Sequence, residues 1–141
     1  MIAIIDYGAG NLTSVRLAFE ALGIDTQITN APDVILSADH VVFPGVGAAR
    51  AAMKNLDGLK LINVLKTVVD QGTPFLGICL GTQIIFEYSD EDNGVNCIGL
   101  VKGAVKLFRP SDVQTKIPHM GWNSVELVRP HPVFNGIKNG I

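Results

Sequence analysis

Short apolar runs alternate along the chain with segments in which apolar residues recur at helical spacing. Consecutive apolar residues are typical of strands buried on both faces of a parallel sheet, and they predict strands over residues 2–6, 40–43 and 75–78. A further strand is expected over residues 24–29. Apolar positions at i, i+3 and i+7 indicate helices, expected over residues 12–22, 48–56, 59–69 and 80–88. This order predicts an α/β fold: an open, mostly parallel sheet with helices on both faces.

The pattern changes after Asn93, where no clear helical spacing remains. Two further strands are expected, over residues 101–108 and 123–128, joined by loops. A chain of 141 residues has the size of one domain, so residues 1–141 are expected to form a single domain. Its last stretch, residues 133–141, has loop composition, and we expect a sheet of this kind to continue beyond it, which would make the domain incomplete at its C-terminus.

Composition excludes several classes of partner. Charged residues make up 17% of the chain, the net charge is −2, and no Lys/Arg run occurs, so binding to nucleic acid or to an anionic membrane is not expected. The mean hydropathy is +0.33, but glycines and Pro74 interrupt the longest charge-free stretch, residues 71–86, which falls short of the ~20 apolar residues of a membrane span. With two cysteines and no signal-peptide pattern, a cytoplasmic location is expected.

Cys79 lies in the sequence Gly77-Ile78-Cys79-Leu80-Gly81, at the junction of a predicted strand and helix. This arrangement has the G-x-nucleophile-x-G form of a nucleophile elbow. A tight turn of this kind presents the central side chain at the carboxyl edge of the sheet, where open α/β folds bind ligands, and the N–H of Leu80 would point to a developing oxyanion. The alternative is a cysteine buried in an apolar segment. The two glycines and the strand–helix context favour the elbow, and Cys97, which has no such setting, is interpreted as a packing residue.

A second glycine-rich turn, Pro44-Gly45-Val46-Gly47, follows the third predicted strand. Its glycines let the backbone approach a substrate closely and offer an N–H donor. Alone it would be an ordinary strand-to-helix turn. Beside the elbow, it is interpreted as the other half of an oxyanion hole.

Together these motifs resemble those of the class I (triad) glutamine amidotransferases, which have a flavodoxin-like sheet. Three stretches narrow the resemblance to the glutaminase subunits of imidazole glycerol phosphate synthase: residues 6–15 (DYGAGNLTSV), 44–48 (PGVGA) and 118–123 (PHMGWN). The last run is the most specific of the three. It also argues against a cysteine hydrolase or stress protein of the DJ-1 type, which shares the elbow.

The resemblance implies that glutamine is hydrolysed to glutamate and that ammonia passes to a (β/α)8-barrel cyclase subunit of histidine biosynthesis. No metal or cofactor is implied. A paralogue that supplies ammonia to surface-sugar synthesis remains an alternative. The residues and roles that the resemblance carries over are Cys79 as nucleophile, Leu80, Val46 and Gly47 as oxyanion donors, Gly45, Gln83 and Glu91 as contacts to the glutamine, and Asn11 and Trp122 at the cyclase interface.

The activating base of such a triad is missing from this sequence. In the family a His-x-Glu motif supplies it, and no His-x-Glu occurs among the 141 residues. His40 precedes its strand, His119 belongs to the 118–123 run, and His131 lies between two prolines, so none is expected to replace it. The chain is therefore expected to be a truncated form, a non-catalytic partner-binding pseudo-glutaminase, or one completed by another chain. Alone it should show little glutaminase activity, since loss of a general base costs ~10²–10⁴ in rate.

Overall fold

The computed structural model describes residues 1–110 and 117–140. The chain divides into two compact units, Met1–Leu107 and Phe108–Ile141. The single domain expected over residues 1–141 stays a prediction.

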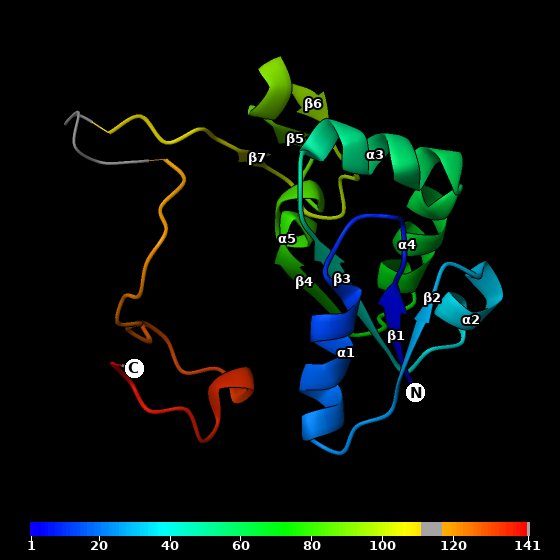
Figure 1. Cartoon of the computed structure of the whole chain (residues 1–141), viewed down its shortest axis with the longest axis horizontal. Coiled ribbons are helices and arrows are strands. Elements are labelled where there is room, and N and C mark those ends of the chain that lie inside the picture. Colours follow the sequence, from blue (N-terminus) through cyan, green and yellow to red (C-terminus); the bar gives the residue numbers. More distant parts are fainter. Residues whose placement is uncertain (111–116, 141) are drawn as a thin grey trace. The chain divides into compact units, whose positions relative to one another are not determined.

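A four-stranded parallel sheet forms the centre of the first unit (Figure 1). Its order is β2-β1-β3-β4, and the strands are β1 (Ile2–Ile5), β2 (Thr26–Thr29), β3 (His40–Gly45) and β4 (Phe75–Cys79). All three pairings are parallel. The four predicted strands and the parallel sheet are confirmed.

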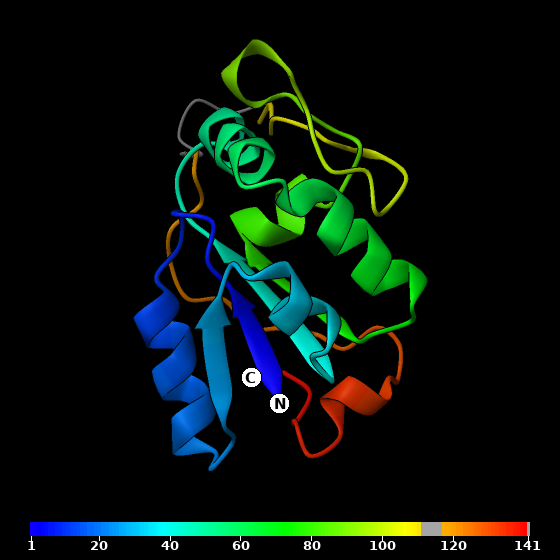
Figure 2. The ribbon, with the colours of Figure 1, turned by 90° about the vertical axis from the view of Figure 1, so that its right-hand side faces the viewer.

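Five helices connect or follow these strands, and they cover both faces of the sheet, as predicted. They are α1 (Leu12–Ala21), α2 (Pro32–Leu36), α3 (Ala49–Gly58), α4 (Leu61–Asp70) and α5 (Leu80–Ile84). Figure 2 shows α1 on one side of the sheet and α4 on the other. The short helix α2 was not predicted from the sequence. It has a proline in its first turn, a position where a backbone N–H would have no acceptor within the helix.

The main hydrophobic core lies between the sheet and the helices α2, α3, α4 and α5. Alternate residues of β1 and β3 point into it, among them Ile5, Val41 and Phe43, all at most 1% exposed. Leu80 and Ile84 of α5 belong to the same core. The start of α5, and with it the junction after β4, therefore rests on this core.

A small second sheet, of order β6-β5-β7, follows α5. Its strands are β5 (Tyr88–Ser89), β6 (Val95–Asn96) and β7 (Ala104–Val105), and the 3-10 turn η1 (Glu91–Asn93) lies between the first two. Two predictions were wrong here. The helix expected to reach Tyr88 ends at Ile84, because Tyr88 pairs with Asn96 in this sheet. Of the strand expected over residues 101–108, only the β7 pair forms.

In the second unit the described regular element is a 3-10 turn, η2 (Pro132–Phe134). The strand expected over residues 123–128 does not form, so that prediction was wrong. Among the described residues of both units, no helix has the length and apolar character needed to cross a membrane.

Candidate active site

Cys79 occupies a strained turn between β4 and α5. It is the last residue of β4, it immediately precedes α5, and its backbone has φ 54° and ψ −118°. A positive φ is uncommon for a residue with a side chain and costs about 1–3 kcal/mol. The residue is exposed. The nucleophile-elbow conformation inferred from the glycine spacing is therefore present.

The two glycines of the elbow are required by close packing. A Cβ at Gly81 would collide with the carbonyl oxygen of Phe43 on β3, and one at Gly77 would lie 3.0 Å from the Cα and N atoms of Thr82. In both cases the added Cβ would collide with backbone atoms, which cannot rotate away as a side chain can. Strand β4 and helix α5 can approach this closely only because both positions lack a side chain.

Gly45 lies directly beside Cys79. The two are register partners at the carboxyl ends of β3 and β4. A Cβ at Gly45 would meet the Tyr7 hydroxyl, and it would lie 2.9 Å from the N atom of Gly81 and 3.0 Å from the Cβ of Leu80. The two glycine-rich turns thus meet at one edge of the sheet, as predicted. Further along the first turn, Val46 is exposed and Gly47 has φ +96°.

Tyr7 is the residue at this edge that sequence reasoning missed. Its side chain is 1% exposed, its ring centroid lies 5.1 Å from that of Phe43, and its hydroxyl has no hydrogen-bond partner among the described residues. Burial, and secondarily the negative charge that Cys79 can carry, raise the pKa of Tyr7 to about 12. The phenol therefore stays neutral at any physiological pH. The alternation of Ala3, Ile5 and Tyr7 toward the core was visible in the sequence, but an orphan hydroxyl was not.

Glu91 lies close to the start of α3. Its Oε2 accepts a hydrogen bond of 2.8 Å from the N–H of Ala49, the first residue of that helix. A carboxylate here is favoured by the helix dipole. The neighbouring Arg50 donates from Nη2 to the carbonyls of Asp92, at 2.7 Å, and Gly94, at 2.9 Å. The predicted contact of Glu91 with a glutamine α-amino group stays a prediction, as does that of Gln83, which is half-buried on α5.

The second cysteine, Cys97, has a different environment. It is partly buried and packs against the hydrophobic core, and its Sγ lies 3.5 Å from the carbonyl oxygen of Val95. Burial, followed by the charge of Glu91, raises the pKa of this thiol. Cys97 is therefore the less reactive thiol by environment, consistent with its interpretation as a packing residue.

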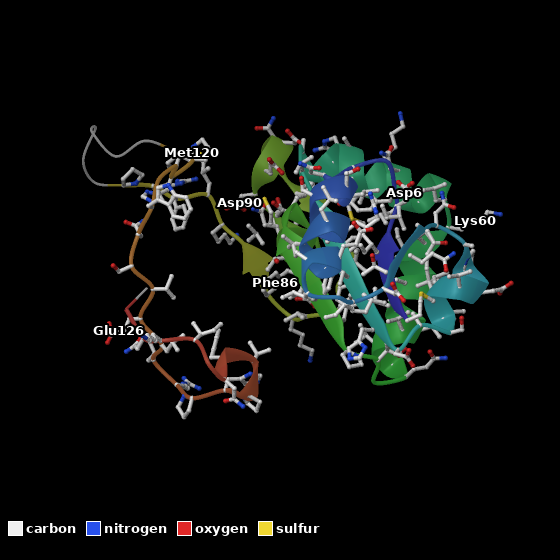
Figure 3. The ribbon with its side chains drawn as sticks, turned by 60° about the horizontal axis from the view of Figure 1, so that its bottom comes forward. Asp6, Lys60, Phe86, Asp90, Met120 and Glu126 are labelled. Carbon is white, nitrogen blue, oxygen red and sulfur yellow. The ribbon has the colours of Figure 1, made fainter. Side chains whose placement is uncertain are left out.

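A cavity of about 490 Å³ lies at the same edge of the sheet, beside the end of β1. Its lining includes Asp6, which follows β1 (Figure 3), together with Asn30 and Lys54. Cys79 is not part of that lining. The geometry of the elbow, and not this cavity, locates the candidate nucleophile.

The one histidine of the first unit does not lie beside the elbow. His40 is the first residue of β3 and so lies at the amino edge of the sheet, opposite Cys79, as predicted. His119 and His131 belong to the second unit, where His119 Nε2 lies 2.6 Å from Asn123 Nδ2 and His131 Nδ1 accepts from the N–H of Val133. Among the described residues no group of three or more His, Cys, Asp or Glu side chains could hold a metal ion.

The two predicted interface residues are both exposed. Asn11 caps α1, since its Oδ1 accepts a hydrogen bond from the N–H of Ser14 at 3.2 Å. Trp122 lies in the second unit and is fully exposed. Their contact with a cyclase stays a prediction.

Comparison with known proteins agrees with this geometry. The sequence model of the family described as glutamine amidotransferase class-I matches residues 3–141. The subunit HisH of imidazole glycerol phosphate synthase from Dehalococcoides mccartyi is 45% identical over 141 residues, which cover 100% of this chain and 67% of that protein. The HisH subunit from Methanocaldococcus jannaschii is 50% identical, over 99% of this chain and 68% of its own length. The chain thus spans about two thirds of the length of these relatives, and it belongs to the class I glutamine amidotransferase family.

Proposed function

We propose that this chain is the glutaminase subunit of an imidazole glycerol phosphate synthase, with Cys79 as its nucleophile. The observation that carries the proposal is an exposed cysteine at φ 54°, at the carboxyl edge of a parallel sheet and beside the glycine-rich turn of β3. The sequence identity to HisH subunits along the whole chain supports the same assignment.

The reaction begins with attack of the Cys79 thiolate on the γ-amide carbon of glutamine. The carbonyl π pair moves to oxygen, and the resulting oxyanion is expected to be bound by the N–H of Leu80 and by the Val46–Gly47 peptide. When the oxyanion collapses, the C–N bond breaks, and the nitrogen leaves as ammonia after taking up a proton. A thioester remains, and water hydrolyses it to glutamate and the free thiol.

The general acid and base of this cycle are not assigned to any residue of the first unit. Its one histidine, His40, lies at the opposite edge of the sheet. The family resemblance implies a His-x-Glu pair for that role, and the sequence contains none. Attack by an already ionised Cys79 needs no base, so labelling by an electrophile tests the nucleophile separately from turnover.

The positions of the other site residues agree with binding of glutamine at the same edge. Gly45 is the register partner of Cys79, and Gln83 follows the elbow on α5. A (β/α)8 cyclase would receive the ammonia, with Asn11 and Trp122 in contact with it. We place the protein in the cytoplasm, where histidine is made.

The test is covalent labelling with a glutamine analogue that carries an electrophilic diazoketone in place of the amide. Mass analysis of peptides should find the adduct on Cys79. The Cys97→Ser variant should label at the same rate as the unaltered protein, and Cys79→Ser should not label. Modification of Cys97 alone, or equal modification of both cysteines, would contradict the proposal.

A further inference from the structure

The Tyr7 hydroxyl is a buried donor without a hydrogen-bond partner in the part of the chain that the structure describes. Of the described side chains, it and Thr26 Oγ1 are the two buried oxygen or nitrogen groups without a hydrogen-bond partner. A buried polar group left without a hydrogen-bond partner destabilises the folded state. An orphan hydroxyl that persists beside a candidate nucleophile calls for a functional explanation.

The position of the hydroxyl is set by three contacts. The Tyr7 ring packs on Phe43, in the core side of the sheet. The hydroxyl then lies against the α-carbon of Gly45, the strand neighbour of Cys79, where any larger side chain would collide with it. The elbow borders the same side of Gly45, since a Cβ at Gly45 would lie 2.9 Å from Gly81 N and 3.0 Å from Leu80 Cβ.

We propose that Tyr7 is a positioning residue for Cys79: its buried, neutral hydroxyl lies beside the elbow and stabilises the thiolate electrostatically when the thiol ionises. This inference rests on the proposed role of Cys79 as nucleophile. The thiol proton leaves the site, and the tyrosine keeps its own. A neutral phenol suits the task, because it can donate to an anion without adding a second negative charge.

Other charged or titratable groups lie near the elbow, and two of them, His40 and Arg50, are placed less well for this role. Those on the elements packed against β4 and α5 are His40, Arg50, Lys54, Asp57 and Tyr88. His40 lies at the far edge of the sheet, and Arg50 is held by the carbonyls of Asp92 and Gly94. Asp6, next to Tyr7, accepts a hydrogen bond from the N–H of Gly8. The negative charge that Cys79 can carry contributes, after burial, to the raised pKa of Tyr7.

The experiment measures how the rate of Cys79 alkylation by iodoacetamide depends on pH, with the site of modification read from peptide masses. In Tyr7→Phe the ring and its packing on Phe43 are kept, and the hydroxyl is removed. Loss of a donor to an anion should raise the midpoint of the profile by about one pH unit and slow alkylation at neutral pH about tenfold. An unchanged profile in folded Tyr7→Phe would overturn the proposal.

Tyr88→Phe is the matched control, because the chain has two tyrosines and Tyr88 packs on Gly94. It should leave the profile unchanged. If Tyr7→Phe does not fold, 3-fluorotyrosine incorporated into the Tyr88→Phe protein changes position 7 alone, keeps the shape of the ring and makes the phenol a stronger donor. The midpoint should then fall, and an unmoved midpoint would overturn the inference. Failure of the glutamine analogue to label Cys79 would instead contradict the proposed function.

Discussion

The two faces of the parallel sheet are packed very differently. On the face covered by α3 and α4, here called the α4 face, Leu61, Leu65 and Val68 of α4 are completely buried. On the opposite face, the α1 face, helix α1 has no buried residue, and Leu76 and Ile78 of β4 are 53% and 37% exposed. The elbow rests on the α4 face through Leu80 and Ile84.

This difference indicates which face of the sheet imposes the strained backbone conformation of Cys79. A positive φ at a cysteine persists only if the surrounding packing imposes it. The close glycine contacts and the buried side chains that could do so all involve the α4 face or the neighbouring strand β3. We therefore expect stability and elbow geometry to depend on the α4 face, and much less on the α1 face.

The largest effect is expected for Leu65→Ala. This change leaves a cavity beneath the sheet and should lower the free energy of unfolding by about 2–5 kcal/mol. Leu17→Ala, on the exposed side of α1, is the matched control and should change it by about 0.5 kcal/mol or less. Urea titration of both variants measures the difference, and equal losses would show that the two faces contribute alike.

The backbone strain at Cys79 can be measured by comparing the stabilities of two variants, Cys79→Gly and Cys79→Ala. Glycine adopts a positive φ without penalty, so Cys79→Gly should be more stable than Cys79→Ala by about 1 kcal/mol. Cys97 is not among the residues of positive φ. There the alanine variant should be the more stable one, because glycine relieves no strain and only increases the conformational entropy of the unfolded chain. The same order at both positions in urea denaturation would show that the elbow stores no strain.

A smaller effect is expected where η1 meets α3. Glu91→Gln removes the negative charge beside the first N–H of α3 and should cost about 0.3–1 kcal/mol at low salt. Asp57→Asn, near the other end of the same helix, should cost nothing, since a negative charge is unfavourable at a helix C-terminus. Thermal unfolding at low and high salt separates the two, and a salt-independent loss in Glu91→Gln would contradict the dipole explanation.

The smallest effect is expected on the exposed part of the α1 face. Leu76→Thr keeps a residue suited to a strand and should change the free energy of unfolding by about 0.5 kcal/mol or less. Val42→Thr, on the same face of β3 but 3% exposed, buries a hydroxyl and should cost about 1–3 kcal/mol. A large loss in Leu76→Thr would mean that this side of β4 is covered in solution.

Much of the fold could be predicted because it depends on local pattern. Strands β1, β3 and β4 contain short apolar runs. Cys79 and Gly45 were expected at one edge of the sheet because the carboxyl ends of parallel strands lie there. The small sheet of β5, β6 and β7 could not be predicted, since its two-residue strands carry no periodicity. Because β5 is not visible as a pattern in the sequence, α5 was expected to continue to Tyr88.

Tyr7 was missed for a different physical reason. An aromatic residue after a buried strand is typical of a core position, and its ring is indeed in the core. What distinguishes it is the absence of a partner for its hydroxyl and the contact with Gly45. Both depend on how β1, β3 and the elbow pack together, which no local pattern specifies.

The most direct test of Cys79 as a glutaminase nucleophile is protection by substrate. The rate at which the diazoketone analogue modifies Cys79 is followed by mass analysis while L-glutamine is increased, with D-glutamine as the control. Modification should slow saturably with L-glutamine and remain unchanged with D-glutamine. A rate that L-glutamine does not alter would show that the thiol reacts outside any glutamine site, and would contradict the proposed function.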